Sequence, residues 1–193
     1  QLSLEKSKAK KPLQIKFLGT ACFLITHDDN AVLTDPFVSN PPLRKVTFGK
    51  LKTDTNLVNE YLSEKELQKV KAVTVGHAHY DHLMDLPYMS KKMKNEVIVC
   101  GSKTTERTLA PFDLSLPILA LNESMVSKQQ AGNWVYTADS SVRILAIECE
   151  HPPHIGNHNI SHGKLEENLR KIPTKGSHYL DGQTLSYLMD FIN

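Results

Sequence analysis

Residues 75–85 read Val-Gly-His-Ala-His-Tyr-Asp-His-Leu-Met-Asp and contain three histidines and two aspartates. The mostly apolar run at residues 72–75 precedes the first histidine and predicts a buried strand that ends at a glycine. Imidazole nitrogens and carboxylate oxygens are ligands that Zn²⁺, Fe²⁺ and Mn²⁺ accept. Polar groups clustered beside a buried strand need a compensating partner. The stretch therefore predicts a metal site, with zinc as the expected ion and iron or manganese as alternatives.

The spacing of the ligands within this stretch indicates two neighbouring metal positions. In an extended segment, side chains two residues apart point to the same side, so His77 and His79 can bind one ion together. Asp81 and His82 follow, and a helical turn there would direct them to an adjacent position. We expect one or two ions. The competing interpretation, in which the histidines are purely structural, does not account for their density.

The segment His77–His82 resembles the His-x-His-x-Asp-His signature of the metallo-β-lactamase fold hydrolases. Residues 17–25 look like the opening hairpin of that family, and residues 32–37 look like its next strand with an Asp-Pro turn. The resemblance runs from about residue 13 to the last residue of the chain. It implies an α/β fold of the αββα sandwich type, in which two sheets pack face to face between layers of helices.

A third histidine of the first site is implied by the same resemblance, at the end of a later strand. The apolar run 142–147 predicts that strand, and it is followed by Glu-Cys-Glu-His-Pro-Pro-His at residues 148–154. His151 matches the family position best. His154 is the competitor, because the stiff Pro-Pro pair could present either ring.

The resemblance also implies a reaction. His77, His79 and His151 would hold the first ion, and Asp81 and His82 would serve the second. A metal lowers the pKa of a bound water to about 7, which yields a nucleophile for hydrolysis. Asp81 would also be catalytic, because it could orient that water and move its proton.

The substrate is predicted from the residues that flank the cluster. Gly76 before it and residues 85–87 after it look more like the branch with ascorbate-phosphate lactonases and phospholipid phosphodiesterases than like true β-lactamases. This favours a phosphoester or lactone in a small-molecule or lipid-derived substrate. The alternative function is a catalytically inactive metal-binding domain, or a fragment, with a role in binding or assembly.

The C-terminal part of the chain departs from the family pattern. Family members continue past a strand such as residues 185–189 to an aspartate that bridges both metals and to a later histidine, whereas this sequence ends at Asn193. Asp190 lies too early to match the bridging position. We therefore expect residues 13–193 to form the first half of the domain and only the start of the second, with part of the inner sheet face uncovered. A truncated product, or a partner chain that completes the sheet, would explain this better than a naturally short member.

Composition sets further limits. The chain has 193 residues, of which 40% are hydrophobic and 23% charged, as expected for one soluble domain. A net charge of +2 is too small to indicate binding to nucleic acid or a membrane surface, and no run is long enough to span a membrane. Lys-rich residues 1–12 predict a flexible tail. The chain begins at Gln1, so the sequence is compatible with a cytoplasmic protein and with an exported protein that has been processed. It is also compatible with an oligomer.

Several local predictions complete the sequence analysis. Helices are expected after Asp54, after Ser63 through Val70, and over residues 103–109 after Ser102. A loop is expected at residues 38–53. Three further expectations concern single features: a faint helical stripe at Leu165, Leu169 and Ile172, a short helix interrupted by Pro87, and core positions for Cys22, Cys100 and Cys149. Asp35 is expected either to support a ligand histidine or to order its turn, and Asp85 to be structural.

Overall fold

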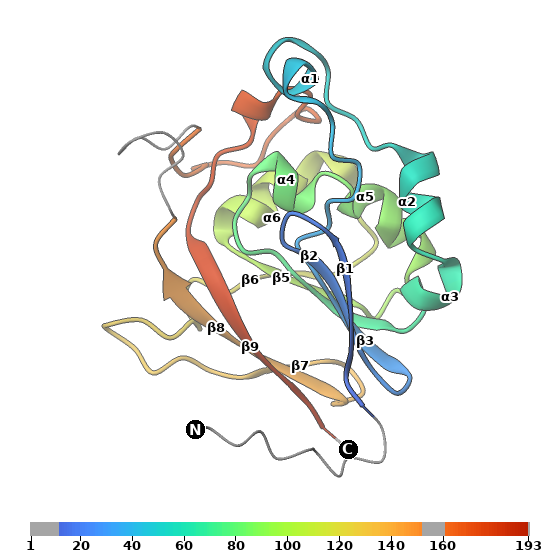
Figure 1. The fold of residues 1–193 in the computed structure, drawn as a ribbon. Helices are drawn as coiled ribbons and strands as arrows, with labels where there is room; N and C mark the ends of the chain where they lie inside the picture. Colours follow the sequence, from blue (N-terminus) through green and yellow to red (C-terminus); the bar gives the residue numbers. More distant parts are fainter. Residues whose placement is uncertain (1–11, 152–160, 193) are drawn as a thin grey trace, which may run out of the picture.

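The computed structural model describes residues 12–151 and 161–192, and His154 therefore lies outside the described residues. A six-stranded sheet runs through the middle of the molecule, with helices on one face and a three-stranded sheet on the other (Figure 1). The chain therefore has an α/β fold with two sheets packed face to face, as predicted.

The six-stranded sheet begins as an antiparallel meander and continues with parallel strands. β1 and β2 are joined at Gly19 and Thr20, which both have a positive φ. From β3 onward the strands are parallel, because helices connect them. In spatial order the strands are β1 (Gln14–Gly19), β2 (Cys22–His27), β3 (Asn30–Thr34), β4 (Val70–Thr74), β5 (Ile98–Gly101) and β6 (Ile118–Ala120).

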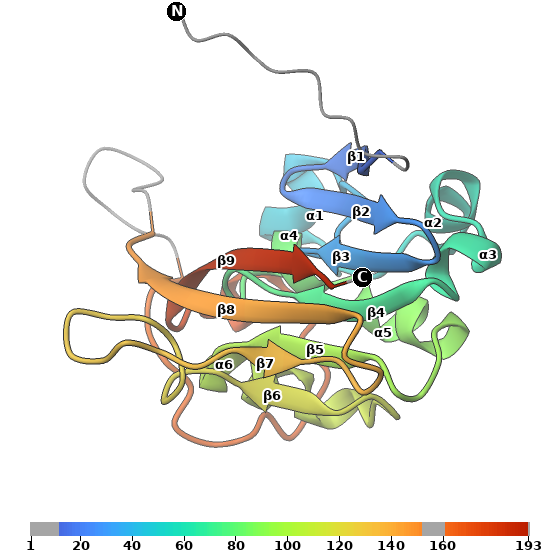
Figure 2. The same cartoon turned by 90° about the horizontal axis from the view of Figure 1, so that it is seen from below.

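The three-stranded sheet is antiparallel, and β8 is its central strand. It consists of β7 (Val135–Tyr136), β8 (Val142–Cys149) and β9 (Thr184–Phe191). Figure 2 shows β8 and β9 lying over the face of the first sheet that the helices leave free.

The helices are short, and three of them begin at the predicted caps. They are α1 (Leu43–Phe48), α2 (Thr55–Tyr61), α3 (Glu64–Leu67), α4 (Tyr80–Leu83), α5 (Leu86–Met89) and α6 (Lys103–Leu109), with 3₁₀ turns at Ser90–Lys92, Ala110–Phe112 and Gly176–His178 (η3). Asp54 accepts a hydrogen bond from the Leu57 N–H, and Ser63 and Ser102 each cap in the same way.

Alternate residues of the central strands enter two separate cores. Leu33, Val73 and Val99 are fully buried on the helical side. Their chain neighbours Val32, Ala72 and Ile98 point the other way, into the core shared with the second sheet, where they meet apolar residues of β8 and β9. Burial on both faces explains why these parallel strands are almost continuously hydrophobic.

Part of the inner sheet face at β1 is exposed among the described residues. Ile15 and Phe17 of β1 pair with Ile25 and Phe23, so all four lie on the face that the second sheet covers elsewhere. Ile15 and Phe17 are both 62% exposed.

Three predictions for residues 38–89 were wrong. Residues 38–53 are not all loop, since they contain α1, which buries none of its side chains and so has no apolar periodicity. The predicted helix after Ser63 ends at Leu67, because Val70 already belongs to β4. The helix near Pro87 is interrupted before this residue, between α4 and α5, and Pro87 sits in the first turn of α5, where no N–H is needed.

The stripe at Leu165, Leu169 and Ile172 does not form a helix in the described residues 161–175. Its backbone binds α6 instead: the Leu169 N–H donates to the Arg107 carbonyl at 3.0 Å, and the Arg107 guanidinium contacts the Leu165 carbonyl. Within residues 12–151 and 161–192, no helix is long and apolar enough to cross a membrane.

Candidate metal centre

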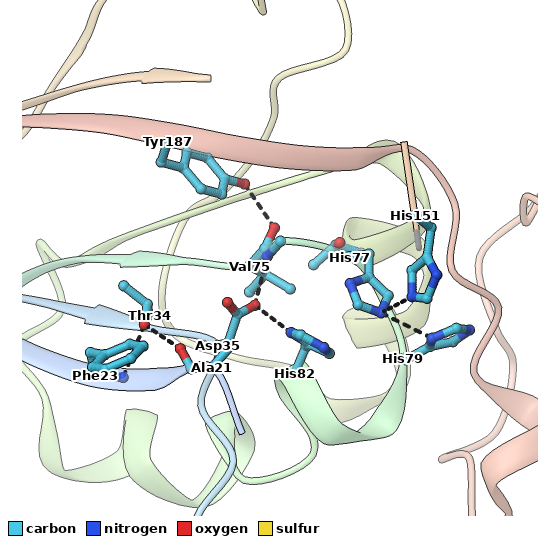
Figure 3. Close-up of polar contacts among 12 residues, drawn as sticks. Ala21, Phe23, Thr34, Asp35, Val75, His77, His79, His82, His151 and Tyr187 are labelled. Carbon is cyan, nitrogen blue, oxygen red and sulfur yellow. Dashed lines mark hydrogen bonds and ion pairs between the residues drawn. The ribbon is translucent and has the colours of Figure 1, made fainter. Parts of the chain in front are cut away.

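The histidine-rich stretch lies at the carboxyl end of β4, and neighbours from both sheets hold its backbone. The Val75 N–H donates to the Cys100 carbonyl at 2.8 Å, and the Ala78 N–H donates to the Asp181 carbonyl at 2.9 Å. The Tyr187 hydroxyl of β9 donates to the Val75 carbonyl at 2.7 Å (Figure 3). These bonds fix the segment from which His77 and His79 project.

Three histidines meet at one point, as Figure 3 shows. Nε2 of His77 lies 2.9 Å from Nδ1 of His79 and 3.0 Å from Nε2 of His151. One ligand atom from each ring lies within 4.8 Å of the other two. His77 and His79 are buried, whereas His151, which follows β8, is partly exposed. The cluster thus joins the ends of strands from the two sheets.

This donor set fits a metal ion. Nitrogens bound at about 2.0–2.1 Å to a tetrahedral ion are about 3.3 Å apart, close to the two separations found here. Facing imidazoles can share only their ring protons, whereas a cation accepts all three lone pairs at once. Three histidines also leave a fourth position open, as catalytic zinc sites do.

Electrostatics favours the neutral form of His79, which is the form that binds metal. Burial lowers the pKa of His79, and this effect outweighs the Ser161 carbonyl and the carboxylates of Asp81 and Asp181, which raise it. The His79 ring therefore stays neutral at a lower pH than the ring of an exposed histidine would.

His82 lies beside the cluster and is held by Asp35. The His82 and His77 rings are 3.9 Å apart between centroids, and Nδ1 of His82 lies 2.9 Å from Oδ1 of Asp35 (Figure 3). Burial lowers the pKa of His82, but the Asp35 carboxylate outweighs this and leaves the pKa raised. Asp35 thus contacts a histidine of the motif, in line with the first of its two expected roles.

Asp81 and His82 lie outside the three-histidine group but border the same space. Both line a cavity of about 590 Å³ together with His77 and His151. Its remaining lining residues are Asp35, Gly76, Cys149, Glu150, Thr184, Leu185 and Ser186. Cys149 is thus beside the cluster rather than in the core, whereas Cys22 and Cys100 are buried as expected.

Two other aspartates take structural roles. Asp85 is fully buried and accepts hydrogen bonds from the backbone N–H groups of Val38 and Ser39 at 2.7 and 2.8 Å and from the Ser39 hydroxyl at 2.6 Å. Asp190 accepts two hydrogen bonds from Arg143, at the end of β8 opposite to His151. Asp190 therefore does not substitute for a bridging ligand.

Sequence analysis missed Asp181, whose side chain is 1% exposed. Its carboxylate lies 2.7 Å from Nδ1 of His162 and accepts the Gly163 N–H at 2.8 Å, while its carbonyl holds Ala78 between His77 and His79. Burial raises the pKa of Asp181, but these hydrogen bonds and the charge of His162 outweigh it and lower the pKa overall. The only local signal was the Asp-Gly turn at Gly182, which has a φ of +69°.

Comparison with known families agrees with this geometry. The model of the β-lactamase superfamily domain matches residues 14–190. The chain belongs to the metallo-β-lactamase superfamily. The match covers both sheets and all three histidines of the cluster.

Three solved structures are among those similar to this chain. A metallo hydrolase from the archaeon Ignicoccus hospitalis is 14% identical, with a TM-score of 0.51 over 93% of this chain and 56% of that one. A protein from Parabacteroides distasonis, assigned as a metal-dependent hydrolase, is 16% identical, with a TM-score of 0.48 over 97% and 60%. CmlA, a diiron β-hydroxylase from Streptomyces venezuelae, is 14% identical, with a TM-score of 0.48 over 98% and 29%. This chain thus spans less than two thirds of each of these structures.

Proposed function

We propose that this chain carries the metal site of a metal-dependent hydrolase. The observation behind the proposal is the convergence of His77, His79 and His151 from the two sheets onto one point. Such a convergence is costly without an ion, because three polar rings are partly or fully removed from water. Zinc is the expected ion, and iron or manganese also accept these ligands.

The residues around the ion would have different roles in hydrolysis. A bound ion supplies Lewis acidity, which lowers the pKa of a coordinated water to about 7. Asp81 borders the cavity and is proposed to orient the attacking water and take its proton. Asp35 fixes the ring of His82, so that His82 presents its other nitrogen in a constant direction.

Asp81 and His82 are proposed to hold a second ion. Both border the same cavity as His77 and His151, and the His77 and His82 ring centroids are 3.9 Å apart, which supports two neighbouring positions. Two protein ligands make a weak site, because a stable one needs three or four. We therefore propose that the second ion binds less tightly than the first.

The proposed reaction is cleavage of a phosphoester or a lactone. The 590 Å³ cavity is large enough for a small substrate, and it combines imidazoles with a carboxylate beside an open metal position. The resemblance of the residues around His77 to the lactonase and phosphodiesterase branch supports these two substrate classes over β-lactams.

The second candidate function is metal binding without catalysis. Asp190 favours it, because this carboxylate is paired with Arg143 and is not at the cluster. A chain of this kind would keep one structural ion and would act in binding or assembly.

Metal content and hydrolysis, measured on the same samples, separate the two candidates. Elemental analysis should find at least one ion per chain, and the full-length gene product should cleave bis(p-nitrophenyl) phosphate or a simple lactone. His77→Ala should lose both metal and activity, whereas His27→Ala should keep both, because His27 packs on Phe191 instead. Stoichiometric metal with no hydrolysis of either substrate would support the non-catalytic candidate.

A further inference from the structure

A second cavity lies directly beside the metal centre and differs from the first in chemistry. Its volume is about 460 Å³, within the range of small-molecule sites. Asp81 lines both cavities, so the two cavities adjoin at this residue. The residues that line the second cavity are Leu43, Val46, Thr47, His79, Tyr80, Asp81, Ser161, Gly176 and Ser177.

The walls of this second cavity are largely apolar. Leu43 and Val46 of α1 and the Tyr80 side chain of α4 supply hydrocarbon surface. Among the described lining residues, the ionisable groups besides the Tyr80 phenol are His79 and Asp81, which belong to the metal-site motif. The cavity is thus polar towards the reacting centre and apolar beyond it.

A glycine lets the η3 segment pack closely against α1 and Tyr80 at the wall of the cavity. Gly176 of η3 is buried, and a Cβ atom there would lie 3.1 Å from Cγ1 of Val46 and 3.6 Å from Cδ1 of Tyr80. The Leu51 N–H donates to the Thr174 carbonyl at 2.7 Å, which ties the η3 segment to the chain after α1. Figure 1 shows the η3 segment next to α1 at the top of the molecule. A larger residue at position 176 would have to displace Val46 and would change this wall of the cavity.

From this arrangement we infer that the substrate carries an alkyl or acyl chain next to the bond that is cleaved. The inference rests on the proposed function, because it places the scissile bond at the histidine cluster and the chain between α1 and η3. An alkyl chain suits these walls, because it removes apolar surface from water without leaving a buried polar group unpaired. Each buried methylene gains about 0.8 kcal/mol, which corresponds to about a fourfold gain in affinity.

The test uses n-alkylphosphonates from methyl to octyl, which cannot be hydrolysed at the carbon–phosphorus bond. They are titrated calorimetrically into the metal-loaded full-length protein. Affinity should rise about threefold to fourfold per methylene until the cavity is filled, and then level off. An affinity that is the same from methyl to octyl would overturn the inference.

Two substitutions on α1 form a matched pair. Leu43 lines the cavity and Phe48 does not, and both side chains are mostly exposed, at 76% and 88%, so neither serine variant should unfold the protein. Leu43→Ser should weaken octylphosphonate binding at least fivefold and leave methylphosphonate binding unchanged, whereas Phe48→Ser should change neither. Equal losses in both variants would show that the exposed face of α1, and not the cavity, holds the chain.

The outcomes also separate this inference from the proposed function. Loss of the chain-length dependence with metal binding and hydrolysis intact overturns only the inference. If affinity depends on chain length in a protein that binds metal but hydrolyses nothing, the result supports alkyl-chain binding in the second cavity. The same result contradicts the proposed hydrolase function.

Discussion

Oδ1 of Asp35 lies 2.9 Å from Nδ1 of His82 and accepts the backbone N–H of Gly76 at 2.7 Å. One carboxylate at the end of β3 thus ties α4 to the residue that precedes His77. A Cβ on Gly76 would lie 3.3 Å from this same Oδ1, so the close approach depends on glycine.

Asp35→Asn should lower the pKa of His82. The carboxylate outweighs burial in the present protein, so burial dominates once the negative charge is removed. The pKa can be followed by NMR titration of the His82 ring in metal-free protein. Asp190→Asn is the control, since Asp190 is paired with Arg143, and an equal pKa change in that variant would contradict the assignment.

His77→Ala should weaken binding of the tightest metal ion at least a hundredfold, because it removes the nitrogen that faces both other rings. His82→Ala should keep this ion, since His82 lies outside the three-histidine group. Competition with a chelator of known affinity measures both. Similar losses in the two variants would show that the division into two positions is wrong.

Asp85→Asn should lower the free energy of unfolding by about 2–3 kcal/mol. The amide keeps one acceptor oxygen, so either the Val38 and Ser39 N–H groups or the Ser39 hydroxyl lose their acceptor, and the negative charge that strengthens these hydrogen bonds is removed. Ser39→Ala, which removes the hydroxyl donor to Asp85 and the acceptor of the Asp54 N–H, should cost about 1–2 kcal/mol. Urea denaturation of both variants tests this order, and a smaller effect for Asp85→Asn would contradict the structural role.

Asp139 should make stability depend on pH. Partial burial raises the pKa of Asp139, but hydrogen bonds from Lys71, Ser141 and Thr137 together outweigh it and hold the pKa well below its usual range. A carboxyl with a lowered folded pKa stabilises above its unfolded pKa of about 4, and this contribution is lost as the pH falls towards the folded pKa. Asp139→Asn should therefore cost about 1 kcal/mol at neutral pH, since the pair is partly exposed, and progressively less below about pH 4.

Thermal unfolding between about pH 3 and pH 7 measures this dependence. Glu167→Gln is the matched control, because the Glu167 side chain is 83% exposed and its closest approach to Arg170 is 4.0 Å. A pH-independent effect of Asp139→Asn would contradict the prediction.

The parts of the fold that local chemistry determines could be predicted from the sequence. Side chains along the central strands alternate between the two cores. Asp54, Ser63 and Ser102 cap the helices that were predicted to begin there, and the histidine-rich stretch follows a buried strand. The gathering of His77, His79 and His151 was expected from the family resemblance, and the structure brings these rings together. Their role as metal ligands stays a prediction, and His154 lies outside the described residues.

The features that were missed depend on contacts between distant residues. Asp181 holds Ala78 through its backbone carbonyl, which leaves no pattern in the sequence. α1 has an exposed apolar residue at each end and no side-chain cap, so no periodicity or capping signal marks it. Leu169 has its amide bound to Arg107 rather than within a helix, which a helical stripe alone cannot indicate.

The positions of the three histidines also have a consequence for the order of folding. His77 and His79 follow β4, whereas His151 follows β8 in the other sheet, so the third ring arrives only after a long loop has closed and the second sheet has docked. A chain that has folded only its first sheet would present two of the three rings and would hold an ion weakly. We therefore expect metal uptake to be a late event that marks a completely assembled molecule, and the retained ion to slow separation of the two sheets.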